Sequence, residues 1–226
     1  MDVEELYRRY AAGERDFSGV DLSRANLNVA KVTYLEDLEP GQNDLSGINL
    51  SGANLTGANL SLVNLSGANL SDAQLDGAKL AEADLSGVNL SNANLYYAEL
   101  CRIDLSGADL SGAILDCTDL DYANLSRANL SGASIVEAML EGIDLSGANL
   151  SNAHFADSAL CNANLTGACL RDTKFYEPLL VGANLTNVDL SESFINLELA
   201  NIDRIRGAIL CNTTMPDGSI RNDHCQ

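Results

Sequence analysis

The chain has 226 residues and a formal net charge of −19, from 32 acidic and 13 basic residues. A surface this acidic repels nucleic acids and anionic membranes, which argues against direct binding to either. No run of about 18 apolar residues occurs, so no membrane-spanning helix is expected.

Residues 2–12 are predicted to form a short amphipathic helix. Asp2 is suited to the N-cap and Gly13 to the C-terminal end. One helical face would hold the larger side chains Val3, Leu6, Tyr7 and Tyr10. We expect this face to cap the first coil of the domain that follows, and binding of a partner is the alternative role.

A period of five residues governs the rest of the chain. From Leu45 to Ile195 every fifth residue is Leu, Ile or Phe, and the residue two places earlier is usually Ala. Neither a helix nor a continuous strand buries a side chain every five residues. A short strand followed by a Ser-Gly turn does fit a period of five. Leu and Ala, two residues apart, then point inward, and the residue between them points outward. The period therefore predicts an all-β solenoid with a hydrocarbon interior.

The branched residues at the Ala position indicate how many repeats make one coil. With four pentapeptides per coil they fall on two of four sides, whereas with three they scatter evenly. Four is therefore favoured, giving about nine coils. The residues concerned are Ile48, Val63, Val88, Ile103, Ile143 and Val188.

The repeat changes phase once, between Leu27 and Leu45, which are three pentapeptides plus three residues apart. The extra residues are expected in a loop at 33–42, which is either a tolerated insertion or a contact loop.

After Ile195 the repeat degrades, because Glu198 and Asp203 occupy inward positions. The expected organisation is a capping helix at 1–13, a solenoid at 14–195, and an irregular last coil with a C-terminal cap at 196–226.

The run from Leu50 to Leu60 reads LSGANLTGANL. It resembles the pentapeptide-repeat family, whose pattern is A-(D/N)-L-x-x. The resemblance implies a right-handed quadrilateral β-helix with four pentapeptides per coil. The segments Tyr10–Phe17 and Met215–Ser219 resemble a cyanobacterial subset of this family. That likeness implies a regulatory protein of a cyanobacterial cell. The cytoplasm is the expected compartment, because the cysteines are expected to be reduced thiols.

The six cysteines do not form a disulfide framework or a metal site. Cys101 and Cys161 share a column but lie three coils, roughly 14 Å, apart, which exceeds disulfide reach. Together with Cys117 and Cys169 on other sides, they are expected to be free thiols. Pairing of Cys211 with Cys225 stays open, since the tail would have to fold back. No Cys-x-x-Cys pair occurs, so neither zinc nor any other cofactor is expected.

The acidic excess lies on the solenoid, because residues 32–203 hold 5 basic and 24 acidic residues (5 − 24 = −19). This charge either keeps the rod soluble or attracts a basic protein surface. Rigid tyrosines beside acids suit a contact surface. The predicted partner-binding face, named here the tyrosine–acid face, consists of Tyr96, Tyr97, Asp116, Glu137, Asp157, Tyr176 and Glu177.

A second acidic column precedes the inward leucines, where Asn and Asp are expected to serve the local backbone. It consists of Asp44, Asp84, Asp104 and Asp144.

Catalysis is not expected, because only His154 and His224 are present and the many Asp and Ser residues belong to the repeat. The sequence favours a monomeric, non-catalytic protein-binding scaffold whose partner has a basic surface. The alternative, implied by the family resemblance, is an acidic DNA mimic that binds a topoisomerase. A charge of −19 over a rod of about 40 Å is close to the density of duplex DNA, which is about one charge per 1.7 Å.

Overall fold

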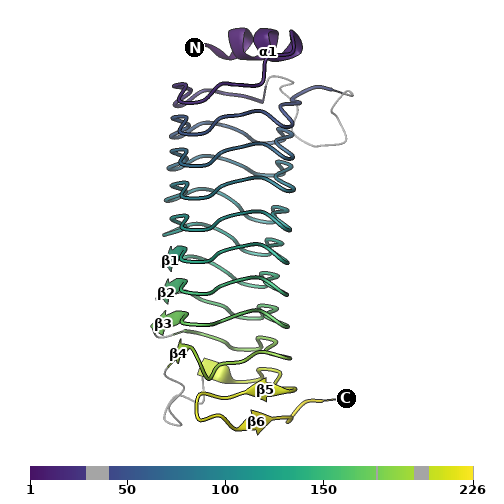
Figure 1. The fold of residues 1–226 in the computed structure, drawn as a ribbon, viewed down its shortest axis with the longest axis vertical. Coiled ribbons are helices and arrows are strands. Elements are labelled where there is room, and N and C mark those ends of the chain that lie inside the picture. Colours follow the sequence, from purple (N-terminus) through teal and green to yellow (C-terminus); the bar gives the residue numbers. More distant parts are fainter. Residues whose placement is uncertain (29–40, 177, 196–203, 226) are drawn as a thin grey trace.

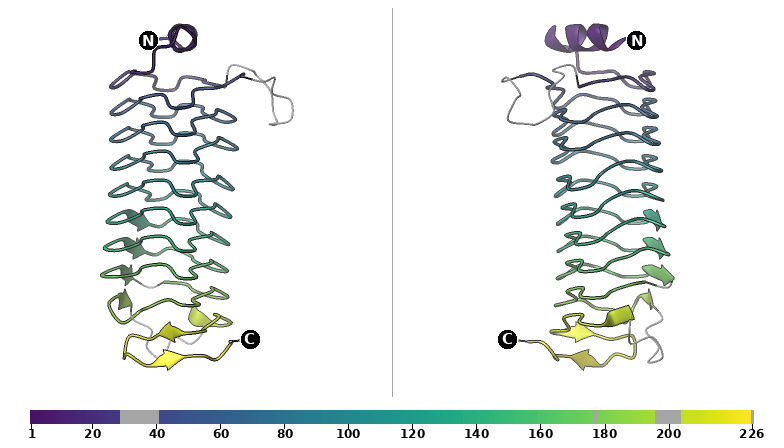
Figure 2. Two further views of the ribbon diagram at one scale, coloured as in Figure 1. Left: turned by 45° about the vertical axis from the view of Figure 1, so that its right-hand side comes forward. Right: turned by 180° about the vertical axis from the view of Figure 1, so that it is seen from behind.

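The computed structural model describes residues 1–28, 41–176, 178–195 and 204–225. The chain winds into a straight rod of stacked coils, with helix α1 at one end and strands β5 and β6 at the other (Figures 1 and 2). The predicted all-β solenoid is thus confirmed as a β-helix. Within the described ranges, no helix is long and apolar enough to cross a membrane.

The coils are held together by parallel backbone pairing between positions that are four pentapeptides apart in the sequence. Asn49 pairs with Asn69, and Asn69 pairs in turn with Asn89. The backbone N–H of each inward leucine donates to the next coil, as from Leu50 to the Asn69 carbonyl at 2.7 Å. Consecutive coils therefore lie about 4.8 Å apart along the rod.

On one side of the rod this pairing is regular enough to form a parallel sheet in the order β1-β2-β3-β4. These short strands stack one above another in Figure 1. In register, Ile135 pairs with Phe155, Phe155 with Phe175, and Phe175 with Ile195. The strand bounds are β1 Ser134–Val136, β2 His154–Ala156, β3 Lys174–Tyr176 and β4 Phe194–Ile195.

The interior is a continuous hydrocarbon core. The fifth-position residues and the alanines two places earlier are buried along the described array, and Leu125 has no exposed surface. The rings of Phe155 and Phe175 stack with centroids 4.9 Å apart. Each buried leucine stabilises the fold by about 1.5–3 kcal/mol before the entropy of ordering it is subtracted.

The Asn and Asp residues before the inward leucines close the turns, as predicted. The Asp44 carboxylate accepts from the Ser46 backbone N–H at 3.0 Å, and the Asn64 amide does the same for Ser66. Asn64 also donates to Asp44 across coils at 3.1 Å. These side chains are therefore engaged by the fold itself.

Helix α1 spans Val3–Ala11, within the range predicted from the sequence, and the Asp2 carboxylate accepts from the Glu5 N–H at 2.8 Å. Leu6 and Tyr10 are buried. The Tyr7 hydroxyl donates to the Leu27 carbonyl at 2.8 Å, and burial raises the pKa of Tyr7.

The first coil is longer than the others. Asp16 pairs with Asn49, whereas Asn49 pairs with Asn69, so the sequence spacing grows from 69 − 49 = 20 to 49 − 16 = 33. The difference amounts to two pentapeptides plus three residues. Most of the predicted loop at 33–42 lies outside the described residues, which resume at Gly41.

The last coil also gains residues, because Asn184 pairs with Ile209, one pentapeptide beyond the usual spacing. The two irregular inward positions, Glu198 and Asp203, lie outside the described residues. Beyond them, strand β5 (Thr213–Thr214) pairs antiparallel with β6 (Ile220–Arg221).

A disulfide joins Cys211 to Cys225 and holds the tail against the last coil. The tail folds back, so Cys211 and Cys225 do pair, which the sequence had left open. The four array cysteines are free thiols, as predicted: Cys101, Cys117, Cys161 and Cys169.

Candidate functional site

The tyrosines of the tyrosine–acid face lie in one column of the rod, Tyr96 and Tyr97 in a turn and Tyr176 at the end of β3. Tyr96 and Tyr97 are exposed and meet edge to face, with ring centroids 4.5 Å apart. The hydrogen bond with Tyr97 raises the pKa of Tyr96. Four coils further on, Tyr176 is exposed and packs edge to face against His154 at 5.2 Å. Rigid aromatic surface is thus presented to solvent at two levels of the rod.

The acids of this face differ in their roles. The Asp116 carboxylate accepts from the Ser134 hydroxyl at 2.7 Å and from the Val136 N–H at 3.0 Å, so it links two coils. Glu137 and Asp157 are exposed in successive coils. Glu177 lies outside the described side chains. The described members of the face therefore lie on one turn row and its flank.

The turns carry an informative asymmetry. From Gly47 to Asn187 the second turn residue of each described pentapeptide has a positive φ. Glycine tolerates this conformation, Asn and Asp visit it, and a larger residue is disfavoured by about 1–2 kcal/mol. Between Gly47 and Asn187, two of the turn columns hold Gly, Asn or Asp in this slot at every level except Arg127.

The other two columns break this rule over consecutive coils. One column places Tyr97, Cys117 and Glu137 in this slot and then Asp157. The second column reads Leu62, Glu82, Arg102, Tyr122. These two columns border a common side of the rod, whose outward strand residues we name the Met139 face: Lys79, Glu99, Asp119, Met139, Ala159 and Leu179. The fold does not require large turn residues there, since glycine serves the same slot elsewhere.

Several exposed apolar residues were missed by the sequence reasoning. Met139 is 50% exposed and Leu179 36%, both on the Met139 face. Ile114 and Phe194 are exposed on the adjoining side that carries β1 to β4. A signal was available, because each occupies the outward position where this repeat normally places Asn or Asp.

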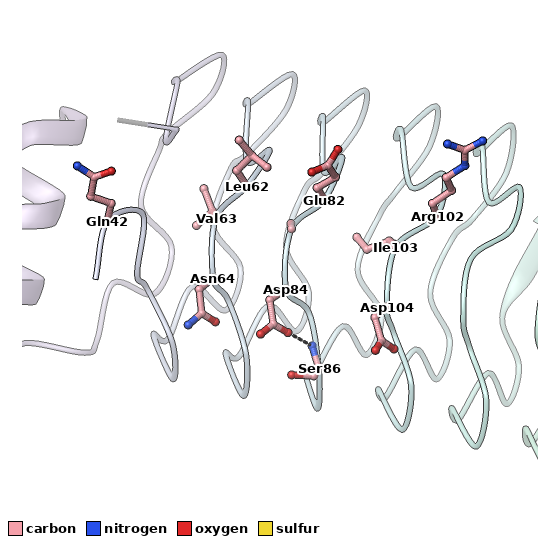
Figure 3. A pocket seen from close by; sticks show the side chains of 11 residues that line it. Gln42, Leu62, Val63, Asn64, Glu82, Asp84, Ser86, Arg102, Ile103 and Asp104 are labelled. Carbon is pink, nitrogen blue, oxygen red and sulfur yellow. Dashed lines mark hydrogen bonds between the residues drawn. The ribbon is translucent and has the colours of Figure 1, made fainter. Parts of the chain in front are cut away.

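An open groove of about 620 Å³ lies on the other flank of the Leu62 column. Figure 3 shows Leu62, Glu82 and Arg102 projecting from successive coils above Asn64, Asp84 and Asp104. The Asp84 carboxylate is engaged by the Ser86 N–H at 3.0 Å, so part of this acidic lining serves the fold.

Tyr122 lies on the surface, whereas Leu62 in the same column is buried. Its ring covers the Cα of Gly142 so closely that a Cβ there would lie 2.7 Å from the ring. Its hydroxyl donates to the Glu141 carboxylate at 3.2 Å, and the charge of Glu141 raises the pKa of Tyr122.

Possible metal ligands and the histidines are dispersed over the described ranges. These ranges contain no cluster of three or more His, Cys, Asp or Glu residues able to hold a metal ion. The two histidines are far apart, with His154 against Tyr176 and His224 accepting from the Leu210 N–H at 3.3 Å.

A five-residue period with coil-to-coil pairing defines the class of protein as a β-helical repeat protein. The family model of pentapeptide repeats matches in 8 copies, at residues 44–80, 68–107, 83–116, 103–142 and 138–175. The chain belongs to this pentapeptide-repeat family. No curated protein sequence matches it.

Several solved structures are similar to this chain. HetL, a pentapeptide repeat protein involved in heterocyst differentiation regulation in the cyanobacterium Nostoc, is 30% identical, with 98% of this chain and 100% of HetL covered and a TM-score of 0.43. Rfr23 from the cyanobacterium Cyanothece is 27% identical over 69% and 96%, with a TM-score of 0.37. Full-length QnrB1, a plasmid-mediated fluoroquinolone resistance protein, is 20% identical over 85% and 92%, with a TM-score of 0.45.

Proposed function

We propose that the protein is a non-catalytic scaffold that binds a protein with a basic surface through the tyrosine–acid face. The observation that carries the proposal is the row of exposed Tyr97, Glu137 and Asp157 in turn slots that the fold would fill with glycine. Tyrosines give rigid contact area at low entropic cost, and a cluster of negative carboxylates raises the association rate with a basic partner.

The rod that presents this face is proposed to be a right-handed, four-sided coil with four pentapeptides per turn. The backbone pairing of Asn49 with Asn69 supports it, because exactly four pentapeptides separate these two residues. Helix α1 is proposed to cap the N-terminal end. Support comes from buried Leu6 and from the hydrogen bonds of Tyr7 and Tyr10 to the carbonyls of Leu27 and Ser46.

The protein is further proposed to act as a monomer in the cytoplasm, as a regulatory protein of cyanobacterial type. The free thiols of the array support a reducing compartment. The Cys211–Cys225 bond would there be open to reduction.

The test is charge reversal on the face, Glu137→Lys with Asp157→Lys, measured as the association rate with a partner identified by capture on the wild-type protein. Asp72→Lys with Asp172→Lys is the matched control, because these acids also occupy positive-φ turn slots but lie in another column. We expect the first pair to slow association at least about tenfold at low salt, with less effect at high salt. Equal effects of both pairs would mean that only the net charge matters.

The acidic DNA mimic is the second candidate, favoured by the columns of carboxylates along the rod. A mimic competes through its overall charge, so purified topoisomerase should be inhibited and the inhibition should fade with added salt. Inhibition lost equally in both reversal pairs would favour the mimic over a scaffold with one specific face.

A further inference from the structure

We infer that the partner docks along the Met139 face with an amphipathic helix whose apolar stripe is flanked by basic residues. The inference rests on the proposed function, since it names the chemistry and the shape of the segment that the scaffold would bind.

The first step is the distribution of exposed apolar side chains in the described array between Asp44 and Ile195. All of them lie on two adjoining sides of the rod. Six belong to the Met139 face or the turns that border it: Tyr96, Tyr97, Tyr122, Met139, Tyr176 and Leu179. The other two, Ile114 and Phe194, lie on the neighbouring side. Exposed apolar residues scattered singly need no explanation, whereas their gathering on one region marks an interaction surface.

The second step is the turn asymmetry described above. The same side is bordered by the two columns that place large residues in left-handed turn slots. Apolar exposure and disfavoured backbone conformation therefore coincide on one side, and Tyr97 and Tyr122 show both. Residues held in disfavoured conformations gather at functional sites.

The third step is the shape of the surface. Met139 and Leu179 each pair with Ala159 between them, so they lie two coils, or roughly 9.6 Å, apart along the rod. Residues i and i+7 of a helix are about 10.5 Å apart and lie on one face. Beside Leu179 lies an open hollow of about 390 Å³, lined by Asp157, Ser158, Ala159, Leu179 and Arg204.

The fourth step is charge complementarity. Carboxylates accompany the apolar residues, with Glu137 and Asp157 along one border and Glu141 beside Tyr122 on the other. The array as a whole carries the excess of −19. A helix that buries its apolar stripe on Met139 and Leu179 would therefore gain from Lys or Arg on both flanks.

The test uses a synthetic amphipathic peptide of about six helical turns, with leucines on one face and lysines on both flanks. A second peptide has the same composition but leucines spread around the helix. Fluorescence anisotropy at about 0.15 M salt should show the first peptide binding at least tenfold more tightly than the second. Met139→Ser with Leu179→Ser should abolish the difference, and Asn152→Gly in a remote turn column should not.

Glycine substitutions provide the second measurement. Tyr97→Gly and Tyr122→Gly relieve the disfavoured turns, so we expect a higher melting temperature together with weaker peptide binding. The control Asn152→Gly should leave binding unchanged, since its slot already holds a residue that tolerates positive φ.

Three results would overturn the inference. Equal affinity for both peptides would show that charge alone attracts them. The proposed scaffold function would still hold in that case if Glu137→Lys with Asp157→Lys slowed association with the protein partner. Unchanged binding in the Met139 and Leu179 variant would remove this face as the site. Self-association in sedimentation, lost in the same variant, would make the occupant a second copy of the chain.

Discussion

Replacing Leu125 by Ala tests how tightly the solenoid interior is packed. The side chain is fully buried, and its backbone N–H donates to the Asp144 carbonyl at 2.7 Å, which fixes the coil spacing. The void nearby is only about 10 Å³ and is lined by apolar residues. Removing three carbons loses about 2.4 kcal/mol of transfer free energy at about 0.8 kcal/mol each. Because the paired coils resist collapse, the cavity term should bring the loss in unfolding free energy to about 3–5 kcal/mol.

The measurement is urea unfolding followed by circular dichroism, with the midpoint compared at equal slope. Met139→Ala is the control, since that side chain is half exposed, and it should cost less than about 1 kcal/mol. Similar losses for both substitutions would refute the inward assignment of the fifth residue. So would a soluble, cooperatively melting Leu125→Asp protein, because an unpaired charge in this interior should prevent folding.

Three further outcomes are expected. Alkylation of unfolded protein without reductant should modify the four array cysteines and spare Cys211 and Cys225, and labelling of all six would contradict the disulfide. Removing the disulfide with Cys211→Ser should destabilise the tail by about 3 kcal/mol. Deleting residues 1–12 exposes the end of the core, so light scattering should show end-to-end association, whereas an unchanged monomer would contradict a capping role. Glu141→Gln should lower the pKa of Tyr122 towards its ordinary value in an ultraviolet titration, because the carboxylate charge no longer opposes the phenolate; an unmoved pKa would contradict that cause.

The solenoid could be predicted because each repeat states the same physical requirements. Leu at the fifth position supplies the core, Asn or Asp supplies the turn acceptor, and Gly supplies the positive φ. The pairing of Asn49 with Asn69 follows from that period once the number of repeats per coil is known.

The insertions were harder to size, because a sequence period reveals only changes of phase. The first coil holds two pentapeptides plus three residues more than a regular coil, and the phase shift before Leu45 disclosed only the three. The last coil gains one pentapeptide, as Asn184 pairs with Ile209, and a whole pentapeptide leaves the phase unchanged. Non-local pairing was needed to count them.

The candidate site could be predicted in part for a related reason. The tyrosine–acid face was predicted from columns of residues one coil apart, and that prediction depends only on the coil length. Met139 and Leu179 could not be predicted as exposed, because an apolar residue in a leucine-rich sequence is ordinary until its side of the rod is known. Likewise Tyr97 and Tyr122 are ordinary turn residues until the backbone shows both in a slot suited to glycine.

A repeat fold makes such departures unusually informative. Because every coil has the same packing and the same turns, the consensus residues are explained by folding. A residue that departs from the consensus and lowers stability needs a separate cause. Arg127 shows that one isolated exception is tolerated, whereas three successive ones in the Tyr97 column and four in the Tyr122 column lie beside one surface. Selection for stability alone would return such slots to Gly, Asn or Asp. The side of the rod that departs most from the repeat is therefore the side on which a partner should be sought.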